Sequence, residues 1–126
     1  MLVAYADDDM DDFEVVAHMF LEIDSSTRCI NAANGRELLK LLDDLTVLPN
    51  LILLDINMPN MDGMSCLKML RADKRFKDIP VYIYSNGTSP VDEARCRKLG
   101  ATDYVRKHFS IPDMRRFLQS LVSQYA

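Results

Sequence analysis

Acidic side chains are concentrated near the start of the chain, and a cluster of carboxylates can bind a cation. Six of the 19 acids fall within eight residues: Asp7, Asp8, Asp9, Asp11, Asp12 and Glu14. Acids in the first turn of a helix gain about 0.3–1 kcal/mol each from the helix dipole, which explains Asp9, Asp11 and Asp12. The dipole does not explain Asp7 and Asp8, which end the apolar segment Leu2 to Ala6. Because adjacent carboxylates repel each other, this pair predicts a bound cation.

A third carboxylate, Asp55, follows the apolar segment Leu51 to Leu54. In a doubly wound sheet, ligands bind beyond the carboxyl ends of the strands, where the winding direction switches. With a strand order of 2-1-3-4-5 the switch lies between the first and third strands, so Asp7, Asp8 and Asp55 converge on one crevice. Carboxylates without a nearby histidine or cysteine favour Mg²⁺ over zinc, with water and one substrate oxygen completing the coordination. Asp9 replaces one member of the pair if the strand ends one residue later.

Two further polar residues end later strand-like segments. Ser85 closes the segment Val81 to Ser85, and Lys107 follows Tyr104 to Arg106. Alone, the first is more often a turn residue and the second a solvated lysine. Together with three carboxylates and Mg²⁺, however, the lysine ammonium gives a site of zero net charge that accepts an anion. A phosphoryl group fits such a site, because its transfer requires mainly positioning and charge neutralisation from the protein.

These residues need a scaffold that brings strand ends together, and the chain has the pattern of one. Five short apolar or β-rich segments begin near Leu2, Arg28, Leu51, Val81 and Asp103, at spacings of 26, 23, 30 and 22 residues. A strand with its crossover helix takes a comparable length, so the pattern predicts five βα units and one parallel sheet covered by helices on both faces. No linker or second domain is indicated within residues 1–126.

Helix starts are marked by residues whose side chains accept backbone N–H groups. Four such N-caps are predicted, at Asp9, Asn34, Ser89 and Ser110. Apolar residues at helical spacing predict a buried face for the helices after Asn34 and Ser110. The helix near residues 90–99 has only a thin apolar stripe, so we expect it to be exposed and loosely packed.

Taken in order, the motifs resemble the CheY-like receiver domains of two-component response regulators. The resemblance rests on Asp7-Asp8 after the first strand, Asp55-Ile-Asn-Met-Pro-Asn-Met-Asp62-Gly63 after the third, Ser85 after the fourth and Gly100 to Lys107 around the fifth. It covers essentially the whole chain, and the gaps of 30 residues from Asp55 to Ser85 and 22 from Ser85 to Lys107 make it specific. It implies an α/β fold, a flavodoxin-like (βα)5 three-layer sandwich of strand order 2-1-3-4-5.

The resemblance implies a role for each acid of the predicted site. Asp55 accepts a phosphoryl group from a phosphohistidine on a sensor histidine kinase or a histidine phosphotransfer protein. Asp8 and Asp55 bind Mg²⁺ directly, Asn57 binds it through its main-chain carbonyl, and Asp7 acts mainly through water. The metal site is therefore expected to comprise Asp7, Asp8, Asp55 and Asn57.

The resemblance also assigns residues to the phosphoryl group and to signalling. Ser85 and Lys107 bind phosphoryl oxygens, and Tyr104 is the aromatic switch whose ring turns inward as the Ser85 hydroxyl moves to the phosphate. Without the resemblance, Tyr104 is a half-buried strand aromatic. The output is a changed surface on the fourth helix, fifth strand and last helix. We expect a signalling protein rather than an enzyme, with at most Mg²⁺-dependent self-phosphorylation and autodephosphorylation.

Two residues depart from the family pattern. His108 stands where the family usually has a proline joined by a cis peptide bond. A cis bond before a residue other than proline costs about 2.5–4 kcal/mol, so we expect a trans Lys107–His108 bond and a shifted loop before Phe109. Asn86 stands beside the hydroxyl, where a small residue is common. Its bulk is expected to restrict access to the phosphoryl group and to alter the lifetime of the acyl phosphate.

Three other functions remain as alternatives. A haloacid-dehalogenase-type phosphatase also uses a strand-end aspartate, but it needs a second aspartate where this chain has Asn57. A flavodoxin-type cofactor binder has a phosphate loop rich in Ser, Thr and Gly, whereas the anionic loop here repels phosphate. A receiver-like interaction scaffold that is not phosphorylated is the third alternative, which His108 and Asn86 favour.

Composition excludes several classes of protein. The 15 basic and 19 acidic residues give a net charge of −4, without the basic stripe of a nucleic-acid binder. The longest aliphatic run, Leu51 to Leu54, is too short to cross a membrane, and no basic leader precedes the first acids. Three widely spaced cysteines are typical of a reducing cytosol. We expect a cytoplasmic, stand-alone domain, monomeric or weakly dimeric, that binds no membrane and no nucleic acid.

Overall fold

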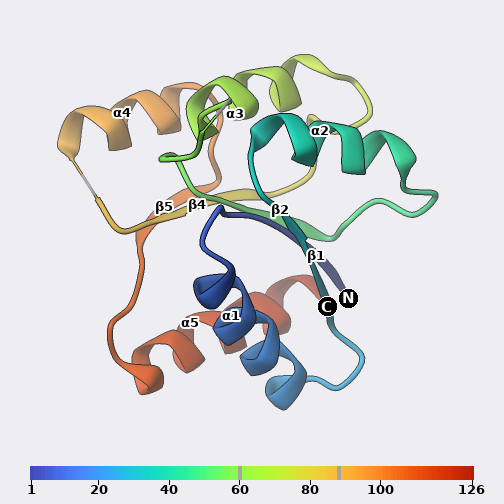
Figure 1. The fold of residues 1–126 in the computed structure, drawn as a ribbon, viewed down its shortest axis with the longest axis vertical. Coiled ribbons are helices and arrows are strands. Elements are labelled where there is room, and N and C mark those ends of the chain that lie inside the picture. Colours follow the sequence, from blue (N-terminus) through green and yellow to red (C-terminus); the bar gives the residue numbers. More distant parts are fainter. Residues whose placement is uncertain (60, 88) are drawn as a thin grey trace.

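The computed structural model describes residues 1–59, 61–87 and 89–126, which form a parallel sheet between two layers of helices (Figure 1). The strand order is β2-β1-β3-β4-β5. This order confirms the predicted three-layer, flavodoxin-like architecture. The strands start at the predicted residues and are β1 Leu2–Ala6, β2 Arg28–Ala32, β3 Leu51–Leu54, β4 Val81–Ser85 and β5 Asp103–Arg106.

A helix follows each strand. The helices α2, α3 and α4 lie on one face of the sheet, and α1 and α5 lie on the other (Figure 1). Parallel strands need such crossover connections, which cover the sheet on both faces. The bounds are α1 Met10–Ile23, α2 Gly35–Asp44, α3 Gly63–Ala72, α4 Pro90–Lys98 and α5 Ile111–Tyr125.

Alternate residues of the central strands fill two separate cores. Tyr5 and Leu53 belong to the core on the α1–α5 side, together with Phe20, and all three are fully buried. Ile52 and Leu54 belong to the core under α2, α3 and α4. Because neither face of the sheet is solvated, β3 is apolar throughout, and polar side chains begin only where it ends. This arrangement concentrates polar groups beyond the strand ends.

Side-chain caps fix where the helices begin. The four predicted N-caps are confirmed, because Asp9, Asn34, Ser89 and Ser110 each accept a backbone N–H from the first turn of the helix that follows. The N-cap of α3 was not predicted: Asp62 accepts from Ser65 N at 2.8 Å. This cap starts α3 directly after the loop that leads away from Asp55.

The helix α4 is exposed, as predicted. Cys96 is the one residue of α4 that is buried.

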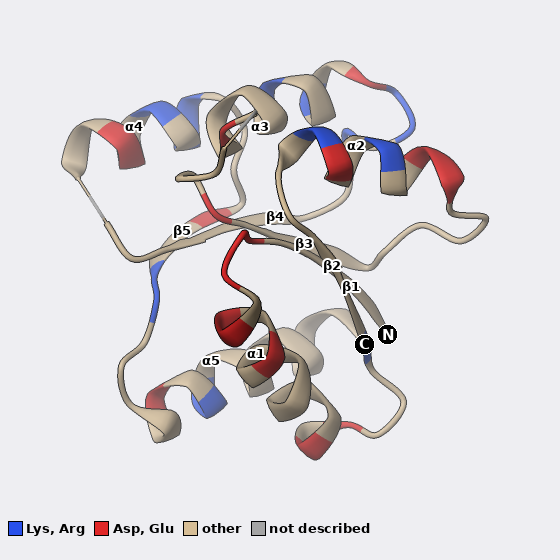
Figure 2. Cartoon of the chain, in the orientation of Figure 1, with Lys and Arg blue, Asp and Glu red and all other residues tan. Residues whose placement is uncertain are grey.

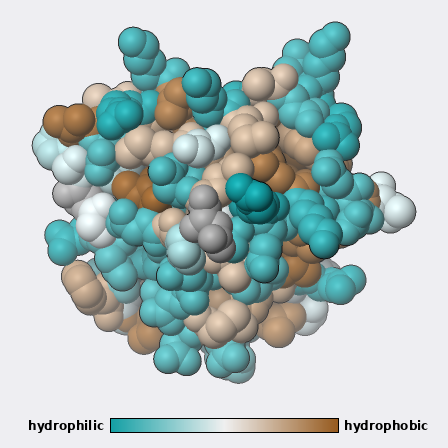
Figure 3. Space-filling model, turned by 45° about the horizontal axis from the view of Figure 1, so that its top comes forward, coloured by the Kyte–Doolittle hydropathy of each residue, from teal (hydrophilic) through white to brown (hydrophobic). Residues whose placement is uncertain are grey.

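Elsewhere the surface is mixed: the face drawn in Figure 3 is mainly hydrophilic, with hydrophobic side chains in separate patches. Among the residues that the structure describes, no helix combines the length and the apolar character needed to span a membrane.

The two ends of the chain meet at the amino ends of the strands (Figure 1). Leu2 N donates to Asn50 Oδ1 at 2.9 Å, and Asn50 Nδ2 donates to Tyr125 O at 3.2 Å. Asn50 directly precedes β3, so this one side chain ties β1, β3 and α5 together. The residues of the predicted site follow the opposite, carboxyl ends of the strands.

Candidate phosphoryl and metal site

Two acidic segments meet where β1 and β3 end. Ala6 pairs with Leu54, so Asp7 and Asp55 are the next residues on neighbouring strands. Asp55 N donates to Ala6 O at 3.0 Å, which extends the backbone ladder to the carboxylate-bearing residue. In the charge-coloured view, acidic residues follow β1 and open α1 (Figure 2). The strand order therefore brings both acids to one edge of the sheet, as predicted.

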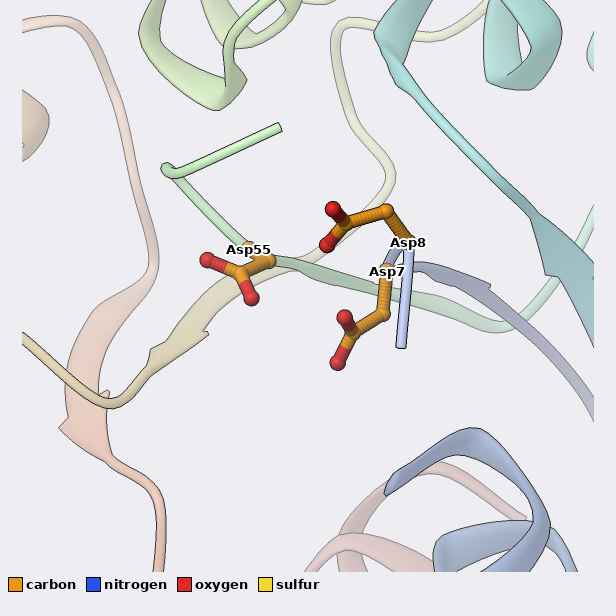
Figure 4. Close-up of side chains that lie close together, drawn as sticks. All are labelled: Asp7, Asp8 and Asp55. Carbon is orange, nitrogen blue, oxygen red and sulfur yellow. The ribbon is translucent and has the colours of Figure 1, made fainter. Parts of the chain in front are cut away.

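Three carboxyl groups, from Asp7, Asp8 and Asp55, surround one small space (Figure 4). One oxygen of each lies within 4.8 Å of the others. Asp7 and Asp55 are buried, with 0% and 6% of their surface exposed, whereas Asp8 is exposed. Oxygen donors with solvent on one side suit Mg²⁺, which keeps several waters in its octahedral shell. The donor set therefore fits the expected ion.

Asp9 does not join this cluster. Its side chain accepts hydrogen bonds from Asp11 N at 3.0 Å and Asp12 N at 3.2 Å, as the N-cap of α1. The alternative in which Asp9 replaces Asp7 or Asp8 requires a longer first strand, but β1 ends at Ala6. The structure therefore retains the first two acids as the pair.

Asp7 is held by three donors. Its Oδ2 accepts from Tyr5 Oη at 2.8 Å and from Lys107 Nζ at 2.6 Å, and its Oδ1 accepts from Asp9 N at 2.9 Å. Burial raises the pKa of Asp7, although these hydrogen bonds act to lower it. Burial and the charge of Asp7 also raise the pKa of Tyr5 well above its usual value, so Tyr5 stays a donor. The contact of Tyr5 with Asp7 was not predicted. The sequence feature that indicates it is the spacing of two residues, which puts both side chains on the same side of the strand.

The two oxygens of Asp55 have different partners. Oδ1 accepts from Ser85 Oγ at 2.8 Å and from Asn57 N at 2.9 Å. Oδ2 lies 3.2 Å from Lys107 Nζ. Ser85 ends β4, the strand that pairs with β3, so two residues 30 positions apart touch. Asp55 therefore contacts the predicted hydroxyl and the predicted ammonium.

The Lys107 side chain is 8% exposed, and its ammonium contacts three carboxylates. Its Nζ lies 2.6 Å from Asp7, 2.9 Å from Asp12 and 3.2 Å from Asp55. Burial acts to lower the pKa of Lys107, but hydrogen bonds with Asp7 and Asp12 and the charge of Asp55 outweigh burial and raise the pKa. Asp12 had been assigned to the helix dipole alone. Its contact with Lys107 was not predicted, because the sequence indicates only that Asp12 lies in the first helical turn after Asp7 and Asp8.

Comparison with known proteins identifies the family. Residues 3–119 match the response regulator receiver domain. The chain belongs to the response regulator receiver family. The polar-differentiation response regulator DivK of Brucella anthropi is 33% identical over 99 residues, which cover 79% of this receiver and 76% of DivK. The match identifies a signalling domain of two-component systems, and it favours this function over the phosphatase and the flavodoxin-type cofactor binder.

Solved structures have the fold of this receiver. The receiver domain of Francisella response regulator 1452 is 31% identical, with a TM-score of 0.78 and coverage of 99% of this chain and 98% of that one. The phosphorylated cyanobacterial phytochrome response regulator RcpA is 20% identical, with a TM-score of 0.89 and coverage of 98% and 92%. Two other relatives are much longer proteins, of which this receiver spans 10% and 19%.

The predicted switch residue of the receiver, Tyr104, is buried rather than half-buried. It is 8% exposed, and its hydroxyl donates to Gly87 O at 3.4 Å. Gly87 lies after β4, close in sequence to Ser85. Tyr104 on β5 therefore contacts the segment that follows the predicted phosphoryl-binding hydroxyl.

His108 is held by aromatic neighbours. The Lys107–His108 peptide bond is trans, as predicted, like the other peptide bonds of the described residues. Tyr84 Oη lies 3.1 Å from His108 Nδ1 and accepts from His108 N at 3.4 Å. The Tyr84 ring also stacks on Phe117, with ring centroids 5.3 Å apart. These contacts fix the backbone directly after Lys107.

Proposed function

We propose that this receiver accepts a phosphoryl group on Asp55. The proposal rests on the contacts of this buried carboxylate with a serine hydroxyl and a lysine ammonium, and on the two further acids that lie beside it. An oxygen of Asp55 attacks the phosphorus of a phosphohistidine, the P–N bond breaks, and its electron pair returns to the imidazole. The products are an acyl phosphate on Asp55 and a free histidine on the donor.

A bound Mg²⁺ would neutralise charge on the phosphoryl oxygens. We assign its direct contacts to Asp8, Asp55 and the main-chain carbonyl of Asn57, and an indirect contact through water to Asp7. The indirect role of Asp7 is supported by its hydrogen bonds, since its Oδ2 already accepts from Tyr5 and Lys107. Asp8 is exposed and so can bind an ion that keeps part of its water shell.

Ser85 and Lys107 are assigned to the phosphoryl oxygens. Both contact Asp55, and both are buried, with 0% and 8% of their surface exposed. Water screens buried groups little, so a hydroxyl and an ammonium here interact strongly with a phosphoryl dianion. Loss of the group follows attack of water on phosphorus, which breaks the P–O bond and restores the carboxylate. Asn86 is exposed directly after Ser85, and its effect on the acyl phosphate lifetime stays a prediction.

Intact-protein mass spectrometry with Mg²⁺ and acetyl phosphate tests this function. We expect the parent to gain one phosphoryl group and Asp55→Asn to gain none, because the amide lacks the carboxylate nucleophile. Asp62→Asn is the matched control: Asp62 caps α3 and makes no other side-chain hydrogen bond among the described residues, and asparagine caps equally well, so this variant should be labelled like the parent. An unlabelled parent under rapid mixing would favour the unphosphorylated scaffold, and repeated release of phosphate from a small ester would favour the phosphatase.

Tyr104 is proposed to couple phosphorylation to the surface formed by α4, β5 and α5 through its buried ring, which lies beside the segment after Ser85. We expect Tyr104→Ala to be labelled on Asp55 like the parent, but to lose the phosphorylation-dependent change in amide hydrogen exchange of α4. Tyr104→Phe, which keeps the ring, is the control and should retain most of that change. The same exchange response in Tyr104→Ala and the parent would contradict the coupling role.

Partners and setting follow from the same proposal. The phosphoryl donor is a sensor histidine kinase or a histidine phosphotransfer protein, and an effector protein reads the changed surface. We propose a cytoplasmic setting, which the free thiols of Cys29, Cys66 and Cys96 support. Residues 1–126 are proposed to act as one domain, monomeric or weakly dimeric, without contact to nucleic acid or membrane.

A further inference from the structure

Asp12 lies beside the site and carries a charge, but the proposed function gives this residue no role. Its carboxylate lies 2.9 Å from Lys107 Nζ, and 38% of its side chain is exposed. Among the described residues, the candidate cation site consists of Asp7, Asp8 and Asp55, and Asp12 is not part of it. Mg²⁺ bound by those three acids therefore leaves the negative charge of Asp12 facing Lys107.

The position of Asp12 is set by α1 rather than by the site. Its backbone N donates to the N-cap oxygen of Asp9 at 3.2 Å, beside the equivalent bond from Asp11 N at 3.0 Å. Asp12 is thus fixed in the first turn of α1, and its carboxylate reaches an ammonium at the end of β5. Asp11, one residue earlier in the same turn, is exposed and makes no contact with Lys107 that the structure records.

All the donors of the ammonium are in use. A lysine ammonium has three N–H donors, and Lys107 faces three carboxylates, from Asp7, Asp12 and Asp55. A phosphoryl oxygen arriving at Asp55 must take one of these donors. Asp7 and Asp55 are both buried, whereas Asp12 is partly exposed and can exchange the ammonium for water at the least cost.

We propose that Asp12 is a positioning residue that competes with the incoming phosphoryl group for the Lys107 ammonium. In the unphosphorylated receiver it holds Lys107, and phosphorylation of Asp55 requires that this contact be given up. The contact therefore contributes to the barrier for phosphoryl uptake, and it links the first turn of α1 to the chemistry at Asp55. This inference rests on the proposed function.

The initial rate of phosphoryl uptake, measured by intact mass at fixed acetyl phosphate and saturating Mg²⁺, tests the competition. We expect Asp12→Asn to be labelled about fivefold faster than the parent, a factor equivalent to about 1 kcal/mol for a partly exposed ion pair. A residue that only supports the fold would slow labelling when replaced. Asp11→Asn removes the same charge from the same helical turn without touching Lys107, and should be labelled at the parent rate.

A second readout does not require phosphorylation. We expect Lys107 to react several-fold faster with an amine-acylating reagent in Asp12→Asn than in the parent or Asp11→Asn, as read by peptide mass. Equal uptake rates in Asp12→Asn and the parent, an equal gain in Asp11→Asn, or unchanged acylation of Lys107 would each overturn the inference and leave the proposed function intact. An unlabelled parent would overturn the proposed function, and with it the competition, even if acylation showed that Asp12 holds Lys107.

Discussion

The Gly63→Ala receiver should be less stable than the parent by about 3 kcal/mol, the upper end of the usual cost of overpacking. A Cβ added at Gly63 would lie 2.7 Å from Ile56 Cα and 2.9 Å from the main-chain carbonyl carbon of Asp55. It would lie closer still to the main-chain carbonyl oxygen of Asp55. These are backbone atoms, which cannot turn away as a flexible side chain can. The loop between β3 and α3 must therefore shift, and Asp55 shifts with it.

Urea unfolding of the two proteins measures this effect, and the labelling rate with acetyl phosphate measures its consequence at Asp55. The matched control is Gly87→Ala, because among the described residues, chain neighbours aside, the nearest atom to a Cβ at Gly87 is Asn57 Nδ2 at 3.7 Å, an ordinary contact distance. Gly87 also lacks a positive φ, so alanine is not strained there. We expect the control to unfold within about 0.5 kcal/mol of the parent. The same stability in Gly63→Ala and Gly87→Ala would show that the loop yields freely.

The Lys107→Met receiver should lose about 3 kcal/mol of stability in the presence of a chelator, because removing one partner of a buried ion pair leaves charge uncompensated. Asp7 and Asp55 are both buried and both contact the Lys107 ammonium. Mg²⁺ should restore much of the loss, since a divalent cation among the acids replaces the missing positive charge. The stabilisation by Mg²⁺ should therefore be larger in this variant than in the parent.

Urea midpoints measured in chelator and in excess Mg²⁺ give the two differences. Lys68→Met is a suitable control, because Lys68 lies exposed on α3 and no ion pair of the described residues includes it. Its stability and its response to Mg²⁺ should match those of the parent. An equal response to Mg²⁺ in Lys107→Met and Lys68→Met would contradict the idea that the ion and the ammonium neutralise the same carboxylates.

The fold was predictable because its signals are local and periodic. Strand starts such as Leu51 and Val81 are marked by apolar runs, and N-caps such as Asn34 are marked by residue type. The N-cap at Asp62 was not predicted, because its signal lies within the family motif that runs from Asp55 to Gly63. The register that brings Asp55 to Ser85 followed from strand order, which is a property of the whole sheet.

The candidate site was predictable only in part. Residues directly after strands, such as Asp55 and Lys107, point to one edge whatever the details of packing. Tyr5 and Asp12 reach the same place through the side-chain direction within β1 and the rotation of α1 about its axis. Those quantities depend on how the core packs. A sequence pattern alone cannot supply them, so the contacts to Asp7 and Lys107 emerged only with the structure.

The hydrogen bonds of Asn50 have a consequence for how this receiver can be attached to other molecules. They hold both chain ends at the amino ends of the strands, and the acids lie at the carboxyl ends. A surface, a fluorophore or a neighbouring protein joined through either end is thus kept on the side of the molecule opposite Asp55, the proposed phosphoryl acceptor. Immobilised receivers would present Asp7, Asp8 and Asp55 outwards, whichever terminus carries the tether.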